Sequence, residues 1–227
     1  MADSIPAPGL GLAHLLRPPR VAPPGDERPP LLALAHGVGS NEQDLFSFAE
    51  ELDPRLVVVS ARAPITRAPS SYAWFNVQFL ANGGFAIAPE QLEASRNAYA
   101  TFVRAAADAY GADPARIYTL GFSQGAIISL VTALVNPRLF AGVIAMSGRI
   151  PPEAEPWLAS PAETAGLPIF QSHGTLDTVI NIEYARSARA ILERQRVDLS
   201  YHEYRAAHTI NQLMFGDMTS WLADRLG

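Results

Sequence analysis

The segment Gly121-Phe122-Ser123-Gln124-Gly125 has the spacing G-x-S-x-G, which can present a serine hydroxyl as a nucleophile. A serine with this role lies on a sharp, strained turn between a strand and a helix, so the residues two before and two after it must be small. Here both are glycine, an apolar run precedes the segment, and a helical pattern follows it. A helix N-cap is the simpler alternative for Ser123. The glycines and the preceding run favour a nucleophile, and the N-terminus of the following helix would stabilise the oxyanion that develops on the attacked carbonyl group.

A serine nucleophile needs a general base, and the chain has five histidines, namely His14, His36, His173, His202 and His208. In proteins with this serine turn the chain order is Ser, then Asp or Glu, then His, which excludes the first two. His173 ends a strand without an intervening strand-end acid, and His202 lies within an alternating strand. His208 follows the last predicted strand, at the carboxyl edge of the sheet where catalytic groups meet. His208 is therefore the predicted base.

Asp177 is the predicted acid of this group, because it follows the strand Pro168–Gln171 in a loop that can reach His208. Such a carboxylate accepts the imidazole N–H, fixes the tautomer and stabilises the imidazolium. The rival Asp198 begins a strand, so it is expected at the opposite end of the sheet. A plain turn residue is the alternative for Asp177, since aspartate is common in turns.

The glycine-rich sequence His36-Gly37-Val38-Gly39 follows the first main strand and predicts the second part of an oxyanion hole. Its glycines allow the backbone to turn inward, so that the N–H groups of Val38 and Gln124 can point at one oxygen. Each such donor typically raises kcat by a factor of about 10²–10³. His36 is expected to be structural. A phosphate loop is disfavoured, because neither G-x-G-x-x-G nor a Walker lysine is present.

Strand-like and helix-like segments alternate along the chain after a proline-rich turn at residues 18–30. An edge strand is expected near residues 10–16. Buried strands are predicted at residues 31–35, 56–60, 117–122, 140–146, 167–173 and 199–204. Helices are predicted at residues 41–51, 89–110, 123–135, 182–194 and 210–226. This alternation predicts one domain over residues 1–227, in which helices cover both faces of a mostly parallel central sheet. Together with the serine turn between a strand and a helix, it predicts an α/β-hydrolase fold.

Composition limits the partners and the chemistry. The 227 residues carry a net charge of −5, and their basic residues are scattered arginines, so nucleic acid binding is not expected. The sequence has no cysteine, which excludes disulfides, thiolate metal sites and a cysteine nucleophile. No metal or other cofactor is expected. No stretch approaches the length of about 20 apolar residues that crosses a bilayer, and residues 1–10 lack signal-peptide features, so a cytoplasmic location is expected.

Several motifs together resemble the phospholipase/carboxylesterase family, which includes acyl-protein thioesterases and small bacterial carboxylesterases. The matching segments cover residues 35–42, 60–64, 72–75, 121–126 and 173–177. This resemblance implies a triad of Ser123, Asp177 and His208, with an oxyanion hole at the backbone of Val38 and Gln124. The chain departs from the family pattern in having Ala207, where glycine is usual, before the histidine. The Val-Pro that usually follows the aspartate is also absent.

The long segment between the second main strand and the helix at residue 89 is rich in aromatic residues. A loop of this length in a compact domain is usually functional, and residues 62–88 are expected to cover the active site. In the resembling family this region lines the acyl pocket, which predicts Trp74, Phe75 and Leu80 as substrate-binding residues. The alternative is that these side chains only cap the sheet.

These expectations converge on a serine carboxylesterase that hydrolyses esters with apolar acyl groups through an acyl-enzyme intermediate. An acyl thioesterase or a lysophospholipase would use the same residues. A non-catalytic binding protein with this fold would have lost a member of the triad, and none is missing. The expected partner is a small-molecule ester or thioester, without stable membrane insertion, and a homodimer is possible.

Overall fold

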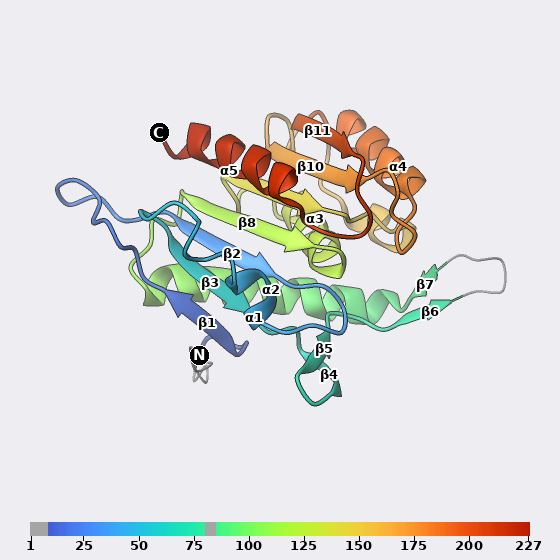
Figure 1. The fold of residues 1–227 in the computed structure, drawn as a ribbon, viewed down its shortest axis with the longest axis horizontal. Helices are drawn as coiled ribbons and strands as arrows, with labels where there is room; N and C mark the ends of the chain where they lie inside the picture. Colours follow the sequence, from blue (N-terminus) through green and yellow to red (C-terminus); the bar gives the residue numbers. More distant parts are fainter. Residues whose placement is uncertain (1–8, 80–84) are drawn as a thin grey trace.

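The computed structural model describes residues 9–79 and 85–227 and contains a seven-stranded central sheet (Figure 1). Six strands are parallel, and β1 pairs antiparallel with β3 at one edge. In spatial order the strands are β1 (His14–Arg17), β3 (Val57–Ala61), β2 (Leu31–Ala35), β8 (Ile117–Phe122), β9 (Gly142–Met146), β10 (Pro168–Gly174) and β11 (Asp198–Tyr204). This arrangement confirms the predicted fold class and the predicted edge strand.

The inner strands are buried on both faces, as their continuous apolar sequences predict. Every residue of β2, β3 and β9 is buried. Alternate residues of β2 enter two separate hydrophobic cores, because successive side chains point to opposite faces of a sheet. Leu31 and Ala33 belong to one core, and Leu32 and Leu34 belong to the other.

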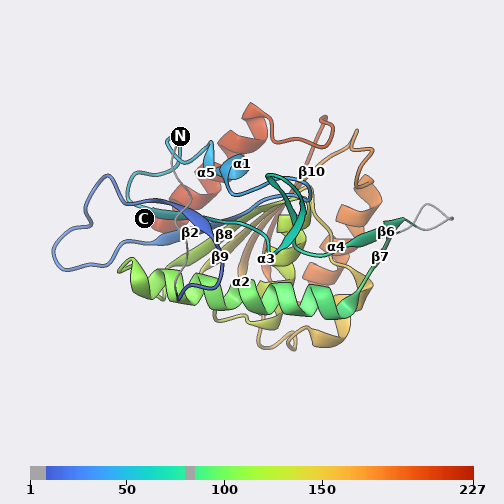
Figure 2. The same cartoon turned by 90° about the horizontal axis from the view of Figure 1, so that it is seen from below.

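Helices close both cores (Figure 2). One core receives apolar residues of α2 (Pro89–Ala109), α3 (Gln124–Val135) and α4 (Ile182–Arg194), and the other receives residues of α1 (Gln43–Phe46) and α5 (Gln212–Leu226). A short 3₁₀ helix, η1 (Pro152–Trp157), follows β9. The Asn211 side chain caps α5 by accepting the Met214 N–H at 2.9 Å.

The predicted helix at residues 41–51 is much shorter in the structure. Helix α1 ends at Phe46, and the chain continues in turns whose N–H groups donate to the carbonyl three residues back. Phe48 donates to Leu45, and Ala49 donates to Phe46. The prediction was wrong in length, because these tighter bonds replace the helical pattern after one turn.

The segment 62–88, which the sequence predicted as a loop, contains short strands. Its described residues contain two antiparallel strand pairs, in which β4 (Ile65–Ala68) pairs with β5 (Ser71–Ala73), and β6 (Val77–Phe79) pairs with β7 (Phe85–Ile87). Strands β6 and β7 project from the body of the molecule (Figure 1). Tyr72 of β5 exchanges two backbone hydrogen bonds of 2.8 Å with residues 39 and 40, so the β4–β5 pair is attached to the glycine-rich loop after β2.

The parallel strands end at a common level, which we call the carboxyl edge, and begin at the opposite amino edge. Their register aligns Ala35 with Gly121, Phe122 with Met146, and Gly174 with Tyr204. The loops that follow β2, β8, β10 and β11 therefore gather at the carboxyl edge, and these are the loops that carry the predicted site residues.

Candidate active site

Ser123 lies on a strained turn between β8 and α3, with φ 55° and ψ −118°. A non-glycine residue rarely adopts a positive φ, and such strain concentrates at functional sites. The turn requires glycine on both sides. A Cβ atom on Gly121 would lie 2.3 Å from the Gly125 carbonyl oxygen, and one on Gly125 would lie 1.8 Å from the Ala35 carbonyl oxygen. The flanking glycines thus let the turn fold against itself and against the end of β2.

Three side chains from three loops form one hydrogen-bonded chain at the carboxyl edge. His208 Nε2 lies 2.9 Å from Ser123 Oγ, and His208 Nδ1 lies 2.6 Å from Asp177 Oδ2. The other oxygen of Asp177 accepts the N–H groups of Val179 and Ile180, each at 2.8 Å. The carboxylate is fully buried and the imidazole is 16% exposed. With Nδ1–H bound to the carboxylate, Nε2 is left to accept the serine proton.

A close backbone approach holds the Asp177 loop beside the His208 loop. A Cβ atom on Gly174 would lie 2.2 Å from the Ala206 carbonyl oxygen, so only glycine fits at the end of β10. Beyond it, the Thr175 N–H donates to Tyr204 at 2.7 Å and the Leu176 N–H donates to Ala206 at 2.9 Å. These bonds position the acid and the base relative to each other.

His173 is a neighbour of the carboxylate that the sequence analysis considered only as a rival base. Its Nε2 atom lies 2.7 Å from the Ile180 carbonyl oxygen and 3.3 Å from Asp177 Oδ2. Burial lowers the pKa of His173 below its ordinary value, so the ring is neutral and its Nε2–H faces these two oxygens. His173 therefore supports the loop that carries Asp177. The four-residue spacing between the two was a visible signal, but only the fold shows that their side chains meet.

The loop after β2 brings the Val38 backbone beside the serine. A Cβ atom on Gly37 would lie 3.3 Å from Ser123 Cβ, and Gly39 adopts a φ of 83° with its N–H donating to Tyr72 at 2.8 Å. Val38 lines the same cavity as Ser123. The Gln124 N–H belongs to the first turn of α3, where amides have no intrahelical acceptor. Both predicted oxyanion donors thus lie next to Ser123.

The Gln124 side chain and Trp74 connect this loop to the nucleophile helix. Gln124 Oε1 accepts the Trp74 N–H at 2.7 Å, and Gln124 Nε2 donates to the Phe75 carbonyl oxygen at 2.7 Å. The Trp74 indole N–H donates to the His36 carbonyl oxygen at 3.0 Å. His36 itself accepts the Ala63 N–H at Nε2 and faces the Gly37 carbonyl oxygen at Nδ1, which is the structural role expected of it. The sequence carried no signal for the role of the Gln124 side chain.

A cavity of about 150 Å³ opens beside Ser123 and has mainly apolar walls. It is lined by Val38, Arg67, Phe75, Val77, Ile87, Ser123, Gln124, Ile127, Arg149, Val179 and Ile180. Of the three predicted substrate-binding residues, only Phe75 lies on this wall. Trp74 is not one of its lining residues, since its indole N–H points to the His36 carbonyl oxygen of the oxyanion loop, and that prediction is corrected. Leu80 lies outside the described residues.

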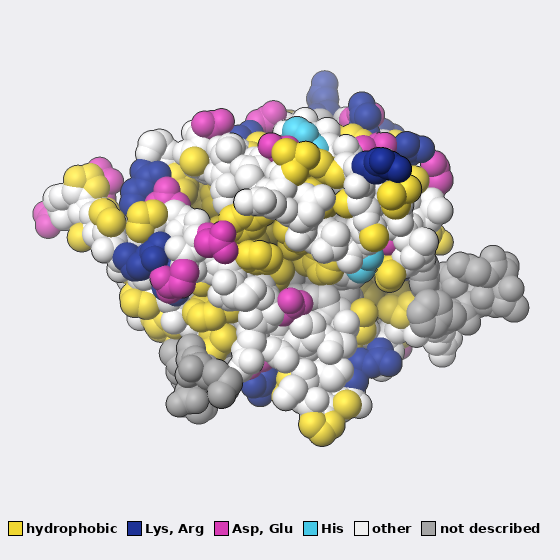
Figure 3. All heavy atoms as spheres, in the orientation of Figure 1, with side chains coloured by type: hydrophobic (Ala, Val, Ile, Leu, Met, Phe, Trp, Pro, Cys, Tyr) yellow, Lys and Arg dark blue, Asp and Glu magenta, His cyan; other side chains and the backbone are white. Residues whose placement is uncertain are grey.

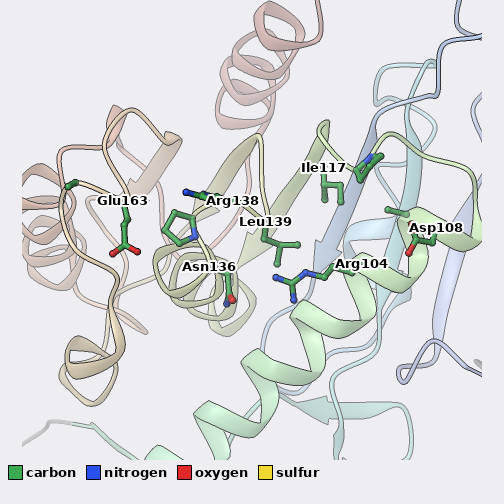
Figure 4. A pocket seen from close by; sticks show the side chains of 11 residues that line it. Arg104, Asp108, Ile117, Asn136, Arg138, Leu139 and Glu163 are labelled. Atoms are coloured by element: carbon green, nitrogen blue, oxygen red, sulfur yellow. The ribbon is translucent and has the colours of Figure 1, made fainter.

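A larger cavity of about 800 Å³ lies at the amino edge, near the starts of β8 and β9 (Figure 4). Its lining mixes Arg104, Asp108, Arg138 and Glu163 with Asn136 and apolar residues. None of its lining residues is a serine, threonine, cysteine or histidine. The larger cavity therefore offers neither a hydroxyl or thiol nucleophile nor a histidine base, and the candidate active site is the smaller one.

Further properties concern metals, membranes and surface charge. Within residues 9–79 and 85–227, no three histidine or acidic side chains group in a way that could hold a metal ion. No helix in that part of the chain is long and apolar enough to span a bilayer. On the face drawn in Figure 3, basic and acidic side chains are interspersed.

A mostly parallel sheet with a strained serine between its central strand and a helix defines an α/β-hydrolase. Sequence comparison gives the particular group, because the Phospholipase/Carboxylesterase family matches residues 16–225. The chain belongs to this family, as its motifs predicted, and is a hydrolase.

Known proteins similar to this chain agree with that assignment. Acyl-protein thioesterase 1 of Kluyveromyces lactis is 28% identical over 222 residues, which cover 91% of this chain and 96% of the relative. The crystal structure of the Bacillus cereus carboxylesterase has a TM-score of 0.78 and 24% identity, covering 94% of both chains. A carboxylesterase from Mesorhizobium loti has a TM-score of 0.80 and 20% identity, covering 98% of both chains. The two structures show that the fold is shared.

Proposed function

We propose that the protein is a serine carboxylesterase in which Ser123, His208 and Asp177 form the catalytic triad. The observation that carries the proposal is the hydrogen-bonded chain from Ser123 Oγ through His208 to Asp177, with distances of 2.9 and 2.6 Å. This geometry matches the relation of nucleophile, base and orienting acid in acyl transfer. The strained serine and the two adjacent backbone N–H groups support the same reaction.

The reaction begins when Ser123 Oγ attacks the ester carbonyl carbon while its proton moves to His208 Nε2. The carbonyl oxygen becomes an oxyanion, which the N–H groups of Val38 and Gln124 would stabilise. The C–O bond to the alcohol then breaks, the alcohol takes the proton from His208, and an acyl-enzyme remains. Water attacks this second ester with His208 as base, the carboxylic acid leaves, and Ser123 regains its proton.

The walls of the cavity support an apolar acyl group of short or medium length. Phe75, Val77 and Ile127 present hydrophobic surface beside Ser123, and the volume of about 150 Å³ is below the 300–1,000 Å³ of typical drug-sized ligand sites. A long acyl chain would extend beyond this cavity.

An acyl thioesterase is the second candidate, and it uses the same residues and the same steps. The observation in its favour is that the Kluyveromyces lactis relative, which matches almost the whole chain, is an acyl-protein thioesterase. A lysophospholipase would also use this triad. These candidates differ in the leaving group and not in the catalytic residues.

A series of p-nitrophenyl esters with acyl chains from two to twelve carbons tests the proposal, with an acyl-coenzyme A thioester of the best chain length for comparison. We expect the highest kcat/KM for a short or medium chain. Faster turnover of the thioester would favour the second candidate. Failure to hydrolyse any ester or thioester would contradict both.

Two expectations concern the protein as a whole. The cytoplasmic location remains a prediction, which cell fractionation tests. The possible homodimer also remains a prediction, which sedimentation equilibrium tests.

A further inference from the structure

Two arginines line the cavity beside Ser123, whereas none of its lining residues is acidic. Arg149 follows β9, and Arg67 belongs to β4. The protein as a whole carries a net charge of −5, so this cavity has the opposite sign from the average of the molecule. A cationic cavity attracts anionic substrates more strongly than the rest of the surface does.

The backbone places Arg149 directly against the helix that begins at the nucleophile. A Cβ atom on Gly148 would lie 2.5 Å from Ala126 Cβ, so the glycine allows the chain to pass in contact with α3. Arg149 comes next and is only 6% exposed. Its guanidinium carbon lies 5.3 Å from the centre of the Tyr184 ring of α4, and Arg149 itself is one of the residues that line the cavity.

Burial lowers the pKa of Arg149, although an arginine stays protonated in proteins. The charge of Glu153, which is not one of the residues that line the cavity, acts on Arg149 in the opposite direction. An anion inside the cavity would therefore meet Arg149 in surroundings of low polarity, where attraction is strong.

We infer that the cavity binds a carboxylate at the far end of the acyl group, with Arg149 as its partner and Arg67 near the entrance. The substrate class is then the half-ester of a short dicarboxylic acid. A planar guanidinium can bind a carboxylate through two parallel hydrogen bonds, and the apolar walls suit the methylene groups between the two carbonyl carbons. This inference rests on the proposed function, since hydrolysis follows the same steps and releases a dicarboxylate and an alcohol.

The competing explanation is structural. Arg149 could serve only to pack on Tyr184 and to balance Glu153, without contacting a substrate. The two explanations differ in whether the charge of the substrate affects turnover, and the test is built on that difference.

The test compares ethyl esters that differ only in charge. Monoethyl succinate, glutarate and adipate are each paired with the ethyl ester in which an amide replaces the free carboxylate. The wild-type protein is expected to hydrolyse at least one acid with a kcat/KM at least about tenfold above that of its amide, which is the effect of one charge-assisted hydrogen bond. The chain length with the highest ratio indicates the reach from Ser123 to Arg149.

Variants assign the preference to one side chain. Arg149→Met is expected to bring the acid-to-amide ratio close to one, and Arg149→Lys to retain part of it because the charge remains. Arg104→Met is the matched control, since Arg104 is an exposed arginine at the amino-edge cavity, and its ratio should equal that of wild type. If Arg149→Met fails to fold, inhibition of wild type by glutarate but not by glutaramide is the deciding measurement.

The outcomes separate the two proposals. A wild-type ratio near one, with the amides still hydrolysed, overturns the inference and leaves the proposed function intact. An unchanged preference in a folded Arg149→Met variant also overturns it. If neither the acids nor the amides nor the p-nitrophenyl esters are hydrolysed, the proposed function itself is contradicted.

Discussion

Two cavities in the described part of the chain lie at opposite edges of one sheet and differ in what they can do. The amino-edge cavity is about 800 Å³ in volume and has a mixed-charge lining, and the carboxyl-edge cavity is about 150 Å³ and mainly apolar. Only the smaller cavity contains a serine that is hydrogen-bonded to a histidine. Size is therefore a poor guide to chemistry in this fold.

The direction of the strands explains the difference. Loops that follow parallel strands gather at the carboxyl edge, and the N-terminus of α3 begins there beside Ser123. Unpaired N–H groups and the helix dipole favour negative charge at that end. At the amino edge, the parallel strands begin, and helix α3 ends instead of beginning. The predictions below test this contrast, beginning with the largest expected effect.

Replacing Ser123 by Ala should lower kcat by about 10⁶, because the acyl-enzyme can no longer form. The measurement is the hydrolysis rate of the best p-nitrophenyl ester. Arg138→Ala, at the amino-edge cavity, is the control and should change kcat by less than about twofold. A comparable loss of kcat from both substitutions would contradict the claim that catalysis takes place only at the carboxyl edge.

Replacing Asp177 by Asn should lower kcat by about 10⁴ while preserving the shape of the site. The amide can donate to His208 Nδ1 and so hold the imidazole in the wrong tautomer. Thermal unfolding of the variant separates this effect from misfolding. A folded Asp177→Asn variant with near-normal kcat would assign the acid role to another carboxylate.

Replacing Gly125 by Ala should destabilise the protein by more than about 4 kcal/mol, since the new Cβ atom would overlap the Ala35 carbonyl group. Gly216 in α5 is the matched control, because no atom lies within 4 Å of the position that its Cβ would occupy. Gly216→Ala should stabilise by about 0.5–1 kcal/mol. Urea unfolding measures both free energies, and equal effects would contradict the close packing described at the carboxyl edge.

Acidification should weaken the protein modestly below about pH 6.5, because burial lowers the pKa values of His14, His36 and His173 from their ordinary 6.5. The unfolded chain then binds more protons than the folded chain, so stability is complete above pH 6.5 and declines as the pH falls towards the folded-state pKa values. Urea midpoints at pH 7.5 and 5.5 measure this decline before most carboxylates titrate. His14→Gln should reduce it, and equal midpoints at both pH values would refute this explanation.

The sequence was most informative where function depends on local spacing. The glycines at 121 and 125 indicated a turn that the close contacts of both residues now explain. The order of the apolar runs placed Asp177 after β10 and His208 after β11, and the structure brings both side chains to hydrogen-bond distance of each other. These features depend on chain order and strand direction, which a single sequence contains.

The sequence was less informative where segments far apart in the chain meet. Trp74 was expected in the acyl pocket, but its indole N–H donates to the His36 carbonyl group and its ring is buried. His173 beside Asp177 and Arg149 beside α3 were likewise not recognised as parts of the site. The two strand pairs within residues 62–88, β4 with β5 and β6 with β7, were not predicted either. The positions of these residues and strands depend on tertiary contacts. Periodicity and composition do not contain information about such contacts.

Labelling with a fluorophosphonate probe tests the central claim most directly, because this reagent reacts with a serine that a neighbouring histidine activates. The wild-type protein is expected to take up one probe, and peptide mass spectrometry is expected to find it on Ser123. The Ser123→Ala variant should remain unlabelled. Absence of labelling in the folded wild-type protein, or attachment at a different residue, would contradict the assignment of Ser123 as the nucleophile.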